Sequence, residues 1–196
     1  MELDIDYITE HYSRMPDQEL IHVATQNARG IRPEVFGIIE NEIKKRNLNP
    51  DLLNAVIAQN KEYSFEEISE HSELLRDLPC PICGSTNDKL NGTVSHTVKS
   101  FLVFTTYEAE PHVACPNCLT KKNNSAILST ALLGWWGIPW GLLKTPVYIY
   151  RNLKAKQEIW SESSNNALLN FTLFKIGEIE AYKDNKEKLR SIIKPK

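Results

Sequence analysis

The sequence is poor in the residues that mark fibrous and low-complexity chains. Its 196 residues include only 8 glycines, 10 prolines, 2 methionines and 4 cysteines. Collagen-like and linker-like chains need far more glycine or proline, so both classes are excluded. Hydrophobic residues make up 41% and charged residues 24%, which also excludes a disordered tail and an integral membrane bundle. The composition predicts one ordinary domain or two small ones.

Signatures of common enzymes are also missing. The chain has no Gly-x-Gly-x-x-Gly, no phosphate-binding loop, no His-Glu-x-x-His and no Gly-x-Ser-x-Gly. The acidic residues of the first half fall at positions typical of a solvated helix face. No residue is nominated as catalytic, and we expect a protein that is not an enzyme.

The first residues, Met-Glu-Leu-Asp-Ile-Asp-Tyr, have neither a basic patch nor an apolar run. They do not fit a cleaved signal peptide, so we expect a cytoplasmic protein with reduced cysteines. There the two pairs, Cys80 with Cys83 and Cys115 with Cys118, predict a metal site rather than disulfides. Four thiolates suit the tetrahedral preference of zinc. We expect one structural Zn²⁺, because four protein ligands leave no open position for a reacting water.

Each cysteine pair sits in a short motif. Cys80–Gly84 (Cys-Pro-Ile-Cys-Gly) has the composition of a zinc knuckle, where glycine can take a positive φ after the second ligand. Cys115–Cys118 (Cys-Pro-Asn-Cys) repeats the motif, but Leu119 replaces the glycine. On these residues, positions 79–120 resemble the zinc-ribbon superfamily. The resemblance implies two knuckles held together by a small β-sheet.

The segment between the cysteine pairs predicts strand. Thr93–Tyr107 is mostly β-branched or aromatic. Asn91-Gly92 predicts a hairpin-type turn before it, and Glu108–His112 a second turn after it. His96 and His112 are expected to be strand or turn residues, because four cysteines already complete the ligand set. The predicted fold class is α+β, with mostly short helices around a small zinc-ribbon β-sheet.

The remaining regions predict helices. Residues 1–76 predict three or four short helices, and 157–196 is again helical in pattern. Asn49 and Ser164 are candidate N-caps, and Ser64–Glu67 fits a capping box. Three prolines stand where first turns would begin, a position that tolerates a missing N–H: Pro16, Pro33 and Pro50.

Residues 125–143 carry no charge and contain three tryptophans near their middle: Trp135, Trp136 and Trp140. Membrane-spanning helices favour tryptophan at their two ends, and glycines and a proline interrupt this segment. We therefore expect a helix at about 124–134, a break, and a second helix at about 142–155. The Trp-rich run after a Cys-Pro-x-Cys motif also resembles a segment, here residues 115–153, of uncharacterised bacterial zinc-ribbon proteins. That resemblance implies no activity.

Both flanks of this segment are basic, with no acid from Leu119 to Gln157. The basic residues are Lys121, Lys122, Lys144, Arg151, Lys154 and Lys156. Because basic residues prefer the cytoplasmic side, basic residues at both ends predict a hairpin or interfacial dip at an anionic membrane. A buried core or a dimer interface explains the apolar run equally well.

The charge is divided along the chain. Residues 1–79 hold 8 Lys and Arg against 16 Asp and Glu, whereas residues 119–196 hold 13 against 6. This favours an anionic partner for the second half; attraction between the halves, or simply solvated faces, explains it equally well. The pattern suggests four regions: a helical region (1–76), a zinc ribbon (77–120), the Trp-rich segment (121–156) and a helical tail (157–196).

Three functions remain open. The first is a zinc-ribbon scaffold or adaptor that docks on the cytoplasmic membrane face or on a membrane complex and binds a further protein. The second is a nucleic-acid-binding zinc ribbon, which the low charge of residues 80–118 disfavours. The third is a soluble homo-oligomeric module whose Trp-rich segment is buried.

Overall fold

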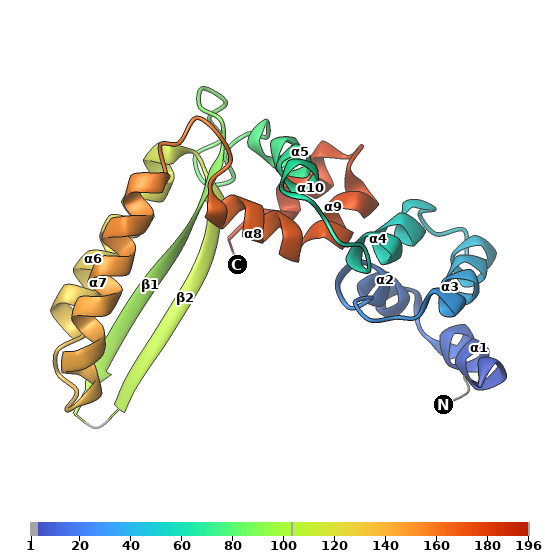
Figure 1. Cartoon of the computed structure of the whole chain (residues 1–196), viewed down its shortest axis with the longest axis horizontal. Coiled ribbons are helices and arrows are strands. Elements are labelled where there is room, and N and C mark those ends of the chain that lie inside the picture. The colour runs from blue at the N-terminus through green and yellow to red at the C-terminus, as the bar shows by residue number, and fades with distance from the viewer. Residues whose placement is uncertain (1–3, 103, 196) are drawn as a thin grey trace. The chain divides into compact units, whose positions relative to one another are not determined.

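The computed structural model describes residues 4–102 and 104–195, which form ten helices and two strands (Figure 1). This arrangement of mostly short helices and a two-stranded antiparallel sheet confirms the predicted α+β class. The chain divides into two compact units. The first unit runs to Glu67 and resumes at Thr172–Ile192, and the second comprises Ile68–Phe171 with the residues from Ile193 onward.

The first unit is a set of short helices around an apolar core. Its helices are α1 (Ile5–Arg14), α2 (Asp17–Gln26), α3 (Pro33–Lys45), α4 (Asp51–Gln59), α9 (Ile176–Tyr182) and α10 (Lys186–Ile192). Leu20, Ile39 and Leu52 are almost fully buried in its core. Helices this short do not persist alone, so burial of one apolar face each stabilises them.

Local signals placed most of these helix starts. Pro33 is the first residue of α3, and Pro16 and Pro50 each precede a helix by one residue. The capping box is confirmed, since Glu67 N donates to Ser64 Oγ at 3.2 Å and Ser64 N donates to Glu67 Oε2 at 2.9 Å.

The two candidate N-caps differ in outcome. The cap at Asn49 is confirmed, because its Oδ1 accepts from Asp51 N at 3.0 Å. The cap predicted at Ser164 is wrong. Asn165 accepts from Leu168 N at 3.0 Å instead, while the Ser164 hydroxyl lies 2.5 Å from Ser72 Oγ. Ser164 therefore makes a tertiary contact, and the next residue, Asn165, caps the following helix.

The second unit is built on a long β-hairpin. Strand β1 (Asn91–Phe101) pairs antiparallel with β2 (Phe104–Ala114), with Asn91 opposite Ala114 and Phe101 opposite Phe104. Helices α6 (Pro116–Leu133) and α7 (Trp140–Glu158) lie along β1 (Figure 1). Helices α5 (Phe65–Arg76) and α8 (Asn166–Phe174) approach the Asn91 end of the hairpin.

Both turns predicted around the strand are wrong. Asn91-Gly92 opens β1, and Glu108–His112 is extended within β2. A Cβ on Gly92 would lie 2.4 Å from Leu168 N, so this glycine permits close approach of α8 rather than a turn. The chain instead reverses between Phe101 and Phe104, inside the predicted strand. The sequence did not predict this reversal, because the apolar run carries no residue typical of turns.

The break predicted in the Trp-rich segment is confirmed, since α6 ends at Leu133 and α7 begins at Trp140. The turn of this helical hairpin lies at the same end as the turn of the β-hairpin, and Leu102 pairs with Gly137 there (Figure 1). Gly141 allows this close packing. A Cβ at that position would lie 2.5 Å from the Gly134 carbonyl oxygen and 2.8 Å from Ser100 Oγ.

Candidate metal centre

The four cysteine sulfurs meet at one point. Cys80, Cys83, Cys115 and Cys118 are free thiols, and their sulfurs all lie within 4.8 Å of one another. Cys83 Sγ and Cys115 Sγ are 3.7 Å apart. That distance is too long for a disulfide and close to the roughly 3.8 Å expected between two sulfurs bound tetrahedrally to one zinc ion. The donor set is therefore compatible with one zinc ion, and no other such group of ligands occurs among the described residues.

The first pair forms a tight turn after α5. Gly84 N donates to Cys80 O at 2.9 Å, and Cys80 N donates to Ser85 O at 2.9 Å. Gly84 has a φ of +74°, the left-handed conformation expected after the second ligand. Cys83 is exposed, whereas Cys80 is fully buried. This pair has the local geometry predicted for a knuckle.

The second pair is built differently. Cys115 is the N-cap of α6, Pro116 is its first residue, and Cys118 lies in its first turn. Leu119 continues the helix and is fully buried, which explains why no glycine follows the second ligand. The N–H groups of a helix N-terminus favour negative charge and so support thiolates there. The second ligand pair is thus a helix start rather than the second knuckle that the resemblance implied.

The sulfurs differ in acidity. Burial alone would raise the pKa of the Cys80 thiol, but backbone N–H groups, including Cys115 N at 3.4 Å, lower this pKa to about 6. Burial raises the pKa of the Cys118 thiol, and the nearby Cys115 and Cys83 sulfurs raise it further. Crowded thiols that resist losing a second proton are the setting in which a bound cation stabilises the thiolates.

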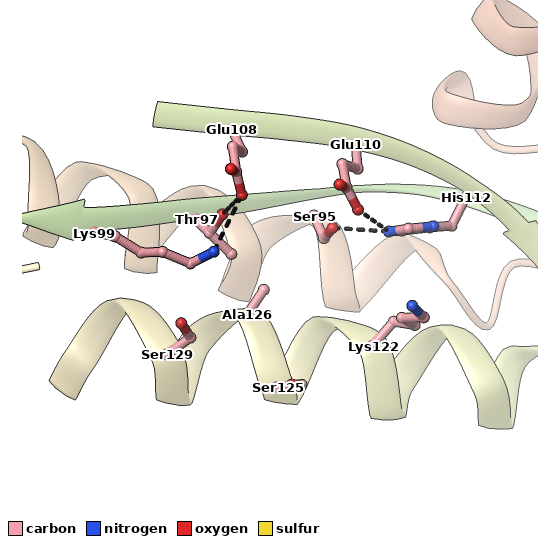
Figure 2. A pocket seen from close by; sticks show the side chains of 10 residues that line it. All are labelled: Ser95, Thr97, Lys99, Glu108, Glu110, His112, Lys122, Ser125, Ala126 and Ser129. Carbon is pink, nitrogen blue, oxygen red and sulfur yellow. Dashed lines mark hydrogen bonds and ion pairs between the residues drawn. The ribbon is translucent and has the colours of Figure 1, made fainter. Parts of the chain in front are cut away.

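Neither histidine joins the cluster, as predicted. His96 lies on β1, and His112 lies buried on β2. His112 Nε2 lies 2.9 Å from Ser95 Oγ and 3.6 Å from Glu110 Oε2 (Figure 2). A serine-histidine-carboxylate relay needs its two partners on different ring nitrogens, so this trio does not have that geometry.

The three tryptophans lie at the far end of α6 from the cysteines, and all are exposed. They belong to a larger surface that sequence reasoning missed in part, because the β-hairpin turn joins it. We call this surface the apolar tip; it comprises Phe101, Leu102, Phe104, Leu128, Leu132, Trp135, Trp136, Ile138, Trp140, Leu143, Val147 and Tyr150. The unbroken apolar run around Phe101 was the available signal.

Polar side chains fill the interior behind this tip. Thr130, Thr145 and Asn152 are each 0% exposed, whereas Trp136 is 68% and Ile138 78% exposed. Asn152 accepts from His96 N at 2.8 Å and donates to His96 O at 2.7 Å. Its carboxamide therefore takes the place of a neighbouring strand on the free edge of β1.

The predicted basic residues are spread along the helices. Lys144 lies four residues from Trp140, about 6 Å along α7. Lys121, Arg151 and Lys154 are exposed and lie just beyond Leu128 on α6 and Tyr150 on α7, and we call these three the basic collar. Lys122 lines a groove beside the sheet, and Lys156 donates to Asn124 Oδ1 at 3.1 Å. The structure thus brings the tryptophans together but not the six cations.

The fold and the cysteine cluster define an α+β protein with four cysteines, placed so that they could hold a metal ion, at the base of a β-hairpin. Among the described residues, no helix has the length and apolar character needed to cross a bilayer. Neither the family models nor the curated proteins nor the solved structures include a match to this chain.

Proposed function

We propose that the chain is a non-enzymatic zinc-binding adaptor that docks its apolar tip on the anionic cytoplasmic face of a membrane. The observation that carries the proposal is the inverted packing of the α6–α7 hairpin. Ordinary domains bury apolar side chains and expose polar ones. Between Asn123 and Asn152, α6 and α7 turn threonine and asparagine inward and leucine, tryptophan and tyrosine outward. A set of large exposed apolar side chains on neighbouring elements marks a membrane or partner contact.

Two tryptophans of the apolar tip have their polar N–H groups hydrogen-bonded within the protein, which suits an apolar medium. Trp135 Nε1 donates to Ala131 O and Trp136 Nε1 donates to Leu132 O, both at 2.9 Å. Both indole N–H groups therefore have partners, and they use carbonyls at the end of α6 that the helix leaves without internal donors. Both rings can enter hydrocarbon without leaving a donor unpaired.

The basic collar supports docking at an anionic surface. Lys121 lies seven residues before Leu128, so both share one face of α6 about 10 Å apart. Lys154 lies four residues after Tyr150 on α7. The outer faces of α6 and α7 thus change from apolar to basic over a distance similar to the depth of a lipid interface. Each cation near anionic lipid contributes about 1 kcal/mol to the binding free energy.

The metal centre would then be structural. It lies where β2 passes into α6, and α6 spans about 27 Å from there to its end near the tip. A zinc ion on the four sulfurs would tie the start of α6 to the turn after α5. This would hold the hairpins together at their base and leave the first unit available to a protein partner.

Vesicle co-sedimentation with phosphatidylglycerol tests the docking. The zinc-loaded chain should sediment with the vesicles. The double variant Trp136→Ser/Ile138→Ser should partition at least tenfold less, because each large apolar side chain contributes about 1.5–3 kcal/mol when buried. Tyr7→Ser is the matched control, since Tyr7 is also 68% exposed but lies on α1.

Two outcomes would overturn the proposal. If the wild-type chain stays in the supernatant, the tip does not dock on lipid. A dimer in analytical ultracentrifugation that the double variant abolishes would then assign the tip to a homo-oligomer interface. Retention of vesicle binding by the double variant would show that attraction by the basic residues alone accounts for it.

A further inference from the structure

A polar groove of about 270 Å³ lies between the hairpin and α6 in the second unit. Ser95, Thr97 and Lys99 line it from β1, and Glu108, Glu110 and His112 line it from β2. Lys122, Ser125 and Ser129 line it from α6 (Figure 2). Nine of its ten lining residues are polar, so the groove is unlike the apolar tip beside it.

Some of these groups are already paired with one another. Thr97 Oγ1 and Lys99 Nζ both donate to Glu108 Oε2, at 3.2 and 3.4 Å. Burial and the nearby Lys122 cation lower the pKa of His112, so its ring is neutral near pH 7. The Glu110 carboxylate therefore faces an uncharged ring and has no cationic partner there.

The α6 wall holds donors without protein partners. The side chains of Lys122, Ser125 and Ser129 make no hydrogen bond or ion pair within the described chain. Their spacing of three and four residues places them on one face of α6. An ammonium and two hydroxyls on one wall suit an anionic group, while the Glu110 carboxylate on the other wall suits a cationic one.

The formal charge of the groove selects between ligands. Lys99 and Lys122 balance Glu108 and Glu110, so the groove is neutral overall. Because Lys99 pairs with Glu108 within the hairpin, the net negative charge of the hairpin wall lies on Glu110 and the positive charge of the α6 wall on Lys122. A simple anion would meet two carboxylates, and a simple amine would meet two ammonium groups. A ligand that carries both charges meets a partner for each.

The position of the groove connects it to the membrane. It extends along α6 from Lys122 to Ser129. Over the same part of the helix, the outer face changes from basic at Lys121 to apolar at Leu128. Lys99 is two residues from Phe101, about 7 Å along β1. A docked tip would therefore place the groove at the level of the lipid headgroups.

We propose that this groove binds the phosphoethanolamine headgroup of a phospholipid, with the phosphate on Lys122, Ser125 and Ser129 and the amine on Glu110. This inference rests on the proposed docking function. It adds recognition of a zwitterionic headgroup to the attraction of the tip for the bilayer.

Nuclear magnetic resonance titration with free glycerophosphoethanolamine tests the groove without a membrane. Amide shifts at Ser125 and Ser129 should saturate, and Lys122→Gln or Glu110→Gln should weaken the affinity about tenfold, the change typical of losing a charged hydrogen bond. Lys186→Gln and Glu187→Gln, at exposed positions of α10, remove the same charges and should leave the affinity unchanged. An equal response to glycerophosphate, or no saturable shift, would overturn the site.

Vesicles separate this proposal from the docking itself. Adding phosphatidylethanolamine to phosphatidylglycerol vesicles should increase binding of the wild-type chain but not of Glu110→Gln. Unchanged binding overturns headgroup recognition while leaving docking intact. If no vesicle binds yet the free headgroup saturates the groove, the docking function fails and the zwitterion site stands.

Discussion

The first unit and the α6–α7 hairpin of the second unit bury different kinds of residue. The first unit packs side chains such as Leu20, Ile39 and Leu52 inward, and charged side chains cover its helices. The second unit buries Leu90, Leu119 and Leu168 near the base of its β-hairpin. Along α6 and α7, however, it packs Thr130, Thr145 and Asn152 inward and exposes its tryptophans. Water exclusion stabilises the first arrangement, together with hydrogen bonds such as those from Gln59 to Ala24 O and Ala55 O. The second needs specific hydrogen bonds and, at its base, four sulfurs that favour a metal.

Removal of one metal ligand should produce the largest difference in stability between the two units. Cys80→Ser removes the most buried sulfur, so metal should be released and residues 77–120 should lose protection from hydrogen exchange, while α1–α4 keep theirs. Zinc binding to small sites contributes on the order of 10 kcal/mol, as much as a whole domain's stability. Metal content by mass spectrometry and residue-level exchange measure both effects. Thr86→Ala, three residues after Cys83 and exposed, is the control; unchanged metal content in Cys80→Ser would refute the site.

The polar interior should depend on Asn152. Asn152→Ala leaves His96 N–H and C=O without their carboxamide partner, and we expect a loss of about 2–4 kcal/mol in the second unit. Urea unfolding of the metal-loaded chain measures this loss. Asn124→Ala on the exposed face of α6 should change stability by less than about 0.5 kcal/mol. If the two variants behave alike, the polar interior does not stabilise the unit.

The close packing at the tip should show in glycine substitutions. Gly141→Ala forces a Cβ against Gly134 O and Ser100 Oγ, which should cost about 1–3 kcal/mol. Gly37→Ala in α3 meets no atom within 4 Å and should stabilise its helix by up to about 1 kcal/mol. Thermal unfolding monitored separately in each unit compares them, and stabilisation by Gly141→Ala would contradict the packing described here.

The smallest expected effect is local to the first unit. Ser64→Ala removes one half of the capping box and should cost about 1 kcal/mol, seen as faster exchange of the Glu67 amide. Ser13→Ala serves as a comparison, because that exposed hydroxyl donates to Glu10 O within α1 and caps nothing. Equal effects of the two substitutions would show that the box adds no stability.

Prediction from sequence succeeded where the cause is local. The capping box at Ser64, the cap at Asn49 and the positive φ of Gly84 depend on residues a few positions apart. It failed at Asn91-Gly92, where a turn signal serves a different purpose. That dipeptide opens a strand because α8, about 75 residues later, passes against Gly92.

The candidate metal centre was predictable because thiolate chemistry and spacing suffice to select it. The structure of the second cysteine pair was not predictable. The motif Cys-Pro-Asn-Cys alone does not distinguish a zinc knuckle from the start of a helix, and only the structure shows that α6 begins there. The apolar tip was predicted only through its tryptophans. Phe101, Leu102 and Phe104 join it because the hairpin reverses beside the α6–α7 turn.

By itself, the sequence determined the kinds of elements, most helix starts and the four sulfur ligands, because periodicity, capping and coordination act over a few residues. Only the tertiary structure decided that α9 and α10 complete the unit of α1–α4, and that α6 and α7 face β1 with their polar sides. Burial depends on which surfaces meet. Had α6 and α7 packed on an apolar partner, the same leucines could have been buried and the same threonines exposed.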